Sequence, residues 1–198
     1  CTPNTKHVFL DNYNIAVSAT LPITKGSVIK TSYTEPLHGT LTRRIHLNNV
    51  KCYMCACPRC SDPTELGTYL GAIYCSKCYI PNSNKDPKEI PKILSTNSLE
   101  NNAEWKCEIC SHTVQAKQMT WGNEAIVKDL QTLNKNNPKE FEEFIIKYEQ
   151  ALHPTNYHII QVKYALTQMY GHIPGFTHNG KEIICFVESN VILKFIWK

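Results

Sequence analysis

The spacing of the cysteines is the feature of this sequence that most directly predicts chemistry. The chain has 198 residues and ten cysteines. Eight of these cysteines fall into two groups with the spacing of metal ligands, and structural zinc takes four tetrahedral ligands with sulfur at about 2.3 Å. We therefore expect two structural zinc ions, one for each group.

The first group contains Cys55, Cys57 and Cys60, which have the spacing C-x-C-x2-C and supply three thiolates. Two cysteines remain candidates for the fourth ligand. Cys52 adds a further C-x2-C pair close by, whereas Cys1 would have to return from about 50 residues upstream. Spacing alone favours Cys52.

The second group consists of two C-x2-C motifs, Cys75 with Cys78 and Cys107 with Cys110, about 30 residues apart. Two such motifs are typical of a zinc ribbon, in which each motif gives two thiolates to one ion. A redox-active C-x-x-C is the alternative, but the presence of a pair of motifs argues against it.

The other metal-binding residue types show no pattern of this kind. Cys185 has no partner at ligand spacing, and we expect it to be a core thiol. The eight histidines do not cluster like ligands. We therefore expect His7, His38, His46 and His112 to be surface or core residues.

Composition and charge limit the class of protein. The chain is 42% hydrophobic and 19% charged, has no apolar run near the roughly 20 residues of a membrane span, and has no secretory signal. We expect a reduced, intracellular protein, cytoplasmic, nuclear or both, without a membrane partner. Eight thiolates and two zinc ions bring the formal charge of +4 to roughly zero, so direct nucleic-acid binding is not expected. A cysteine rather than a methionine stands first, so we expect a fragment whose N-terminal part is missing.

The elements that position the first group are predicted to be strands followed by a helix. Residues 7 to 33 are typical of β-structure, with strands at 8–10, 15–19 and 28–33. Thr40 to Val50 predicts a short helix with Thr40 as its cap. We expect Arg43 and Arg44 to lie on a solvated face of this helix.

The second group is followed by a helical pattern. Residues 81–102 are rich in Pro, Asn, Ser and Lys and predict a loop. Three helices are expected after it. They begin near Asn123, at Pro138 and after the cap Asn156; the second continues to Leu152 and the third ends at Gly171. The runs 183–187 and 191–197 predict strands.

Several motifs together resemble a known family. Cys1-Thr2-Pro3-Asn4 resembles the end of the Asn-His-Ser-Cys-x-Pro-Asn motif of SET-domain protein lysine methyltransferases, and residues 19–26 and 30–33 fit the C-terminal half of that domain. Thr40 to Arg44 and the cysteine triad resemble the SET and MYND domain (SMYD-type) branch. The ribbon and helices are similar to its arthropod-type members. The resemblance covers residues 1 to about 175.

The resemblance implies an α+β fold with five parts. These are the C-terminal half of a β-rich SET domain (1–37), a post-SET zinc segment (38–66), a zinc ribbon (67–118), a helical region (119–176) and an atypical tail (177–198). The first half of the SET sheet, its Gly-rich cofactor segment and the MYND zinc finger are absent from the sequence. A SET site is assembled from both halves, so we expect residues 1–198 alone to be inactive.

The resemblance also implies roles for single residues. It moves the fourth ligand of the first zinc from Cys52 to Cys1. It makes Tyr33 the catalytic residue that orients a substrate lysine towards S-adenosylmethionine, and Tyr53 the aromatic residue against the cofactor adenine. Asn4 is expected to be structural.

The expected function is therefore part of a S-adenosylmethionine-dependent protein-lysine N-methyltransferase. Its partner would be a protein substrate, histone or non-histone, with a reactive lysine. A non-catalytic, zinc-binding SET-like adaptor remains the main alternative. Nucleic-acid binding by the ribbon is a further alternative, which the charge weakens.

Overall fold

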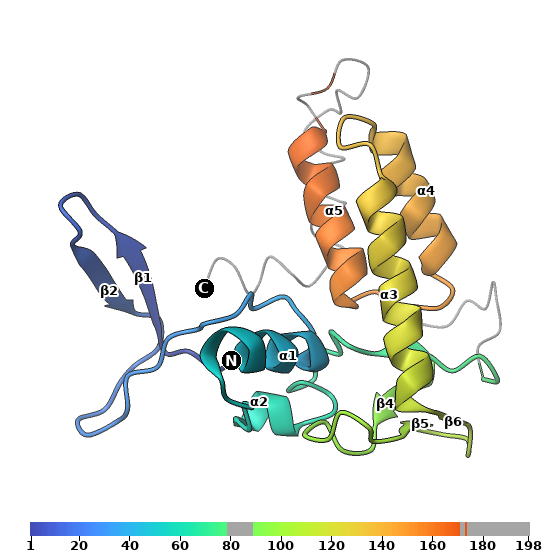
Figure 1. Ribbon diagram of the computed structural model, residues 1–198, viewed down its shortest axis with the longest axis horizontal. Coiled ribbons are helices and arrows are strands. Elements are labelled where there is room, and N and C mark those ends of the chain that lie inside the picture. Colours follow the sequence, from blue (N-terminus) through green and yellow to red (C-terminus); the bar gives the residue numbers. More distant parts are fainter. Residues whose placement is uncertain (79–88, 171–172, 174–198) are drawn as a thin grey trace.

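The computed structural model describes residues 1–78, 89–170 and 173, and these form a mixed structure of helices and two small antiparallel sheets (Figure 1). No helix in these ranges is long and apolar enough to cross a membrane. The strands are β1 (Thr5–Phe9), β2 (Ile15–Ala19), β3 (Ile73–Tyr74), β4 (Lys92–Ser95), β5 (Trp105–Cys107) and β6 (Thr113–Val114). The helices are α1 (Thr40–Lys51), α2 (Pro58–Ser61), α3 (Ala116–Thr132), α4 (Pro138–Tyr148) and α5 (Tyr157–Met169).

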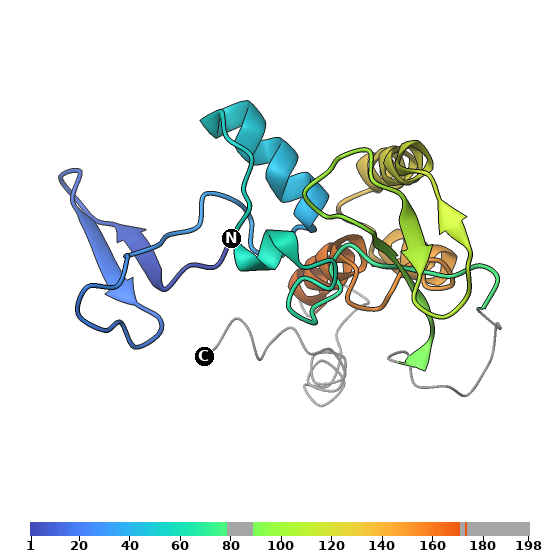
Figure 2. The ribbon, with the colours of Figure 1, turned by 90° about the horizontal axis from the view of Figure 1, so that it is seen from below.

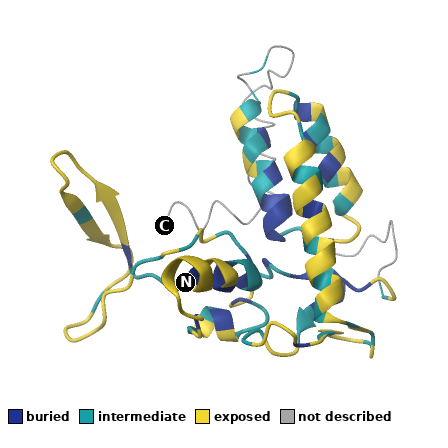
Figure 3. Ribbon diagram, in the orientation of Figure 1, coloured by how far each residue is buried: buried dark blue, intermediate teal, exposed yellow. Residues whose placement is uncertain are grey.

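The first two strands form a hairpin that projects away from the rest of the protein. β1 pairs with β2 in a register that joins Thr5 to Ala19 and Phe9 to Ile15. Both predicted strands are confirmed, although the first covers Thr5–Phe9 rather than 8–10. Figures 1 and 2 show the hairpin standing clear of the helices, and Figure 3 shows that most of its residues are exposed. Phe9, for example, is 75% exposed. Its apolar side chains are therefore not part of a core formed by the described residues.

The third predicted strand, 28–33, is wrong. This segment belongs to neither sheet and is held by Asn4 instead. The side chain of Asn4 donates to the carbonyl of Val28 at 2.9 Å and accepts from the N–H of Lys30 at 2.7 Å. The Lys30 carbonyl accepts from the N–H groups of Asn4 and Thr5. Asn4 thus has the structural role that was expected of it.

Helix α1 confirms the predicted helix, but two details differ. Its N-cap is Gly39 rather than Thr40, and the N–H of Thr40 donates to the Glu65 carboxylate at 3.0 Å. The expectation that Arg43 and Arg44 are solvated is wrong, since their exposed fractions are 0% and 4%. Both are buried because they donate to groups of the cysteine segment, which folds back onto this helix.

The second sheet has the strand order β3-β4-β5-β6 and carries the ribbon cysteines. The prediction of a loop over 81–102 is wrong at β4, which is a central strand paired with both β3 and β5. Ile93 on β4 is 1% exposed and packs with Cys75 and Cys107. Residues 79–88 of the predicted loop lie outside the described residues.

The three predicted helices are confirmed, with shifted ends. α3 starts at Ala116 rather than near Asn123, because Gln115 and Gln118 form a reciprocal cap there. α4 begins at Pro138 as predicted but ends at Tyr148, before Leu152. α5 is capped by Asn156, whose side chain accepts from the N–H of His158 at 3.1 Å. Gly171, Cys185 and the predicted strands at 183–187 and 191–197 lie outside the described residues.

The helices pack around a common apolar core and against the start of the ribbon. The buried core residues are Ile126, Phe141, Phe144, Leu152, Ile159, Val162 and Leu166. Backbone bonds join the ribbon to the turn before α5, from Tyr74 N–H to the Ala151 carbonyl and from Tyr157 N–H to the Leu70 carbonyl. The Asn156 side chain adds a bond to the Ala72 carbonyl at 3.0 Å. The ribbon and the helical region are therefore joined by main-chain contacts.

Asn156 has two separable roles that substitution can distinguish. Asn156→Ala removes both the cap and the bond to Ala72, and we expect it to lower the free energy of unfolding by about 2 kcal/mol. Asn156→Ser keeps a capping hydroxyl, so about 1 kcal/mol should return. Urea unfolding of both variants measures the difference, and equal midpoints would contradict the capping role.

His153 makes stability depend on pH. Burial, helped by the positive charge of Lys92, lowers its pKa to about 4, and its Nδ1 accepts from the N–H of Thr155 at 3.2 Å. The unfolded chain takes up this proton near pH 6.5 and the folded chain does not. We therefore expect His153 to make the free energy of unfolding fall between pH 6.5 and 4, by up to about 1.4 kcal/mol per pH unit.

Urea unfolding at pH 7 and pH 5, with zinc content monitored, tests this expectation. The variant His153→Asn keeps an acceptor but cannot titrate, so its pH dependence should be shallower than that of the wild type. Identical slopes would show that His153 is not responsible.

Candidate metal centres and their surroundings

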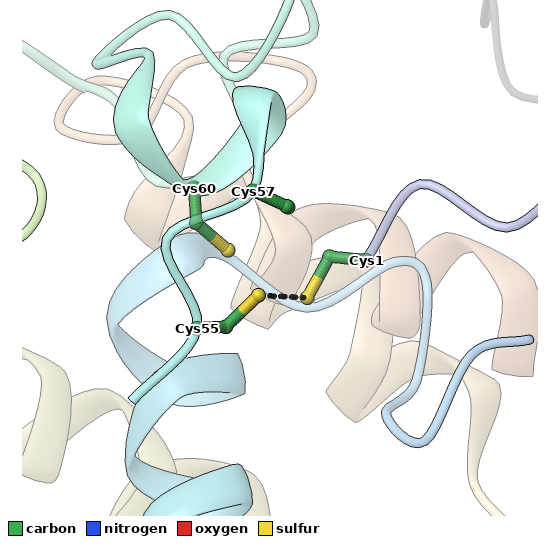
Figure 4. Close-up of side chains that lie close together, drawn as sticks. All are labelled: Cys1, Cys55, Cys57 and Cys60. Atoms are coloured by element: carbon green, nitrogen blue, oxygen red, sulfur yellow. Dashed lines mark hydrogen bonds between the residues drawn. The ribbon is translucent and has the colours of Figure 1, made fainter. Parts of the chain in front are cut away.

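The first cysteine group is assembled from two distant parts of the chain. The Sγ atoms of Cys1, Cys55, Cys57 and Cys60 all lie within 4.8 Å of one another. Figure 4 shows Cys1 reaching the segment that leads into α2. The Cys1 sulfur lies 4.0 Å from that of Cys55. A tetrahedral zinc with sulfur ligands at 2.3 Å needs sulfur–sulfur separations of roughly 3.8 Å. The donors and their spacing therefore fit one zinc ion.

Cys52, which local spacing favoured, lies outside this group. It is exposed and terminates α1 in a left-handed conformation with φ 55°, its N–H donating to the carbonyl of Asn48. The chain turns away from the helix axis at this residue. Cys52 thus serves the backbone turn that brings the next three cysteines into position.

The second cysteine group lies at one end of the four-stranded sheet, where β3 and β5 finish. Its sulfurs lie within 4.8 Å of one another, with Cys75 3.7 Å from Cys110 and Cys78 3.9 Å from Cys107. The Cys107 sulfur accepts the N–H groups of Ile109 and Cys110, each at 3.4 Å. These backbone bonds stabilise a thiolate, and the geometry again fits one zinc ion.

The thiols of the first group differ in how readily they lose the proton that a metal ion would replace. Burial raises the pKa of Cys60 to about 11, although a hydrogen bond and the charge of Arg43 act in the opposite direction. Burial opposes ionisation of Cys57 too, but hydrogen bonds from Cys55 and Cys60 outweigh it and lower its pKa to about 7. A zinc ion would replace these protons, so its binding releases protons to solvent.

Two buried arginines of α1 hold the segment that carries the first group. Arg44 donates from Nε to the carbonyl of Cys55 at 3.1 Å and from Nη1 to the carbonyl of Ser98 at 2.8 Å. Arg43 lies 3.7 Å from the Cys60 sulfur through Nη2 and pairs with Glu65. The sequence missed both residues, because arginine on a helix with few apolar residues is usually solvated.

Tyr33 and Tyr53 lie beside the first group and are partly exposed. Thr34, next to Tyr33, places its Oγ1 3.9 Å from the Cys1 sulfur, and Lys51 Nζ lies 5.3 Å from the centre of the Tyr33 ring. Burial, with smaller contributions from neighbours that include Tyr33, raises the pKa of Tyr53. The exposed fractions of Tyr33 and Tyr53 are 57% and 44%. The two rings are thus near the first cysteine group but open to solvent.

A second polar cluster, which the sequence did not predict, lies between α1, α3 and α5. The side-chain oxygen Oδ1 of Asn123 accepts from the hydroxyl of Tyr157 at 2.5 Å and lies 2.8 Å from His158 Nε2. His38 and Gln161 complete the cluster, with their Nε2 atoms 3.0 Å apart. The cluster lines a hollow of about 470 Å³. Its members are too far apart in the chain to form a local motif.

Comparison with known proteins identifies the family. No family model matches the chain. Isoforms B and A of the SET domain-containing protein SmydA-8 from Drosophila melanogaster are both 32% identical to it over 165 residues, which is 82% of the chain. The chain belongs to the SMYD-type SET-domain proteins. This SMYD-type chain spans about a third of these relatives, 35% of isoform B and 34% of isoform A.

The two candidates for the fourth ligand of the first centre can be separated by zinc content. In this SMYD-type chain we expect Cys1→Ser to lose one of two zinc ions and Cys52→Ser to keep both, since only Cys1 places its sulfur among the other three. Zinc release with a colorimetric chelator and elemental analysis give the counts. The reverse pattern would overturn the assignment.

Proposed function

We propose that this chain contributes the C-terminal part of a S-adenosylmethionine-dependent protein-lysine N-methyltransferase site, with two structural zinc ions. The observation that carries the proposal is the contact between the first cysteine group and the segment of Tyr33. Cys1 lies 3.9 Å from Thr34, and Tyr53 is two residues before Cys55. The same metal centre therefore adjoins both residues that the family resemblance assigns to the site.

The first zinc would act as a clamp on the site. Cys1 and Cys55 are 54 positions apart in sequence, so an ion bound to both closes a long loop and fixes its two ends together. A second contact joins the segment after Tyr33 to the Cys55–Cys60 segment, because Arg59 donates to the Pro36 carbonyl at 2.8 Å. Zinc would thus position side chains without taking part in methyl transfer.

Tyr33 would act on the substrate amine through its hydroxyl. Its hydroxyl would form a hydrogen bond with the substrate amine and so orient the deprotonated lysine towards the bound cofactor. S-adenosylmethionine supplies the electrophilic methyl group when it is bound. The contribution of Tyr33 is orientation, which is a large part of catalysis when two reactants must meet in line.

Tyr53 would bind the adenine of the cofactor. Its ring is partly exposed, at 44%, and can offer one face for stacking. This face lies on the cysteine loop, so the first zinc would also set its orientation. The substrate is proposed to be a protein lysine, histone or non-histone.

The solvent exposure of Tyr33 and Tyr53 supports the proposal that further SET-domain residues are needed to complete the site. Tyr33 is 57% exposed, and neither it nor Tyr53 lines the hollow of about 470 Å³ or the larger one of about 540 Å³ among the described residues. The apolar hairpin beside them is exposed as well. We therefore propose that residues 1–198 alone do not methylate protein, and that a protein containing the whole SET domain does.

Methyl transfer from labelled S-adenosylmethionine to histone and non-histone lysine peptides tests this proposal. We expect no turnover by residues 1–198 and, in a protein with the whole SET domain, a loss of about 100-fold for Tyr33→Phe with zinc content unchanged. The exposed Tyr13 of the hairpin provides a matched control, and Tyr13→Phe should retain activity.

Turnover by residues 1–198 alone would refute the proposed division of the site. Activity of the Tyr33→Phe protein equal to that of the wild type would remove Tyr33 from the mechanism. If the complete protein binds two zinc ions and transfers no methyl group, the non-catalytic adaptor becomes the better description.

A further inference from the structure

Arg43 lies at the centre of a buried polar cluster beside the first cysteine group. Its side chain is fully buried, with an exposed fraction of 0%. Nη1 donates to the His38 carbonyl and to Glu65 Oε2, the latter at 2.6 Å. Nη2 donates to Thr40 Oγ1 at 2.8 Å and lies 3.7 Å from Cys60 Sγ. One guanidinium thus joins the start of α1, a carboxylate and a candidate metal ligand.

The guanidinium of Arg43 offsets part of the negative charge that gathers around it. Four thiolates on a divalent ion leave two net negative charges, and the carboxylate of Glu65, only 3% exposed, adds a third. Arg43 and Arg59 face these charges, with Arg59 Nη2 3.7 Å from Glu65. Removing one partner of a buried charge cluster is costly because the others remain unpaired. Arg43 is the more buried of these two cations.

The second cysteine group is stabilised in a different way. Its Cys107 sulfur accepts hydrogen bonds from two backbone N–H groups of its own turn. Among the described side chains, the nearby Lys92 pairs with Glu108 at 3.7 Å, and its ammonium also lies over the ring of Tyr69. The first group also has a backbone donor, from Cys60 to the Cys57 sulfur. Among the described residues, however, an arginine side chain approaches a sulfur in the first group only, which makes the second group a control for the first.

We propose that Arg43 is a positioning residue of the first metal centre, which donates a hydrogen bond to the Cys60 thiolate and keeps that sulfur unreactive while zinc is bound. The inference rests on the proposed zinc site. A hydrogen bond to a coordinated thiolate withdraws electron density from sulfur, and such outer contacts also orient the ligand. The planar fork of arginine can reach Glu65 and Cys60 together, which a lysine ammonium cannot.

This arrangement links the state of the sulfur to the start of α1. Arg43 holds the Glu65 carboxylate, and the same carboxylate caps the N–H of Thr40 at 3.0 Å. Arg43 also donates to the carbonyl of His38, just before the helix. Loss of Arg43 would therefore affect both the metal centre and the segment that follows Tyr33.

Alkylation of the zinc-loaded protein tests the proposal. Wild type, Arg43→Met and Arg44→Met are treated with iodoacetamide, and the modified cysteines are identified by mass spectrometry. We expect Cys60 to react about tenfold faster in Arg43→Met, the change that corresponds to losing one hydrogen bond to a charged group. The ribbon cysteines should keep their wild-type rates. Arg44→Met removes another buried arginine, whose hydrogen bonds go to the carbonyls of Cys55 and Ser98, and it should not accelerate Cys60 to the same extent.

Two further measurements cover the case in which Arg43→Met fails to fold. Arg43→Lys keeps the charge, but we expect its ammonium to pair with Glu65 and leave Cys60 without a donor, so Cys60 should again react faster than in the wild type. In cobalt-substituted protein, the sulfur-to-cobalt charge-transfer band should move to lower energy in Arg43→Lys, because the sulfur becomes a better electron donor.

The outcomes separate this inference from the proposed zinc sites. Fewer than two zinc ions per wild-type chain would overturn both. Two ions with an unchanged Cys60 rate and an unchanged cobalt band in the Arg43 variants would overturn the role of Arg43 alone. Equal acceleration at both cysteine groups would also overturn it, since that result indicates general loss of structure.

Discussion

The closure of the chain between Cys1 and the Cys55–Cys60 segment is the constraint on which the candidate site depends. It joins residues 54 positions apart through sulfur atoms that lie 4.0 Å from each other. Without it, the N-terminal hairpin and the segment up to Thr34 have few contacts that fix them against α1. Because closing a long loop costs entropy that weak contacts do not recover, a strong interaction is needed at this point. Four thiolates around one ion are such an interaction.

Helix α1 transmits this constraint to the rest of the protein. Arg44 binds the Cys55 carbonyl on one side and the Ser98 carbonyl of the ribbon on the other. Tyr157 of α5 lies 3.3 Å from the hydroxyl of Thr42, so the same helix contacts the helical region. The first cysteine group, the segment after β4 and helix α5 are thus all joined to α1 by polar contacts.

The sequence predicted what is local and missed what depends on distant partners. The C-x-C-x2-C and C-x2-C motifs are local, and their sulfurs do come together. The place of Cys1 beside them could be expected only from the family resemblance, since a ligand so far upstream leaves no trace in spacing. Arg43 and Arg44 were misjudged because their partners lie on other segments. The strand predicted at 28–33 failed for a similar reason, because this segment makes irregular bonds to Asn4 and to Thr5 at the start of β1, far upstream in the chain.

The hairpin β1–β2 has a consequence for handling the protein. Among the described residues this sheet has only its two strands, and large apolar side chains such as Phe9, Ile15 and Val17 are more than half exposed. An isolated pair of strands of this kind can extend its sheet by pairing with another chain. Purified residues 1–198 would therefore be prone to concentration-dependent association through the hairpin, even with both metal centres filled.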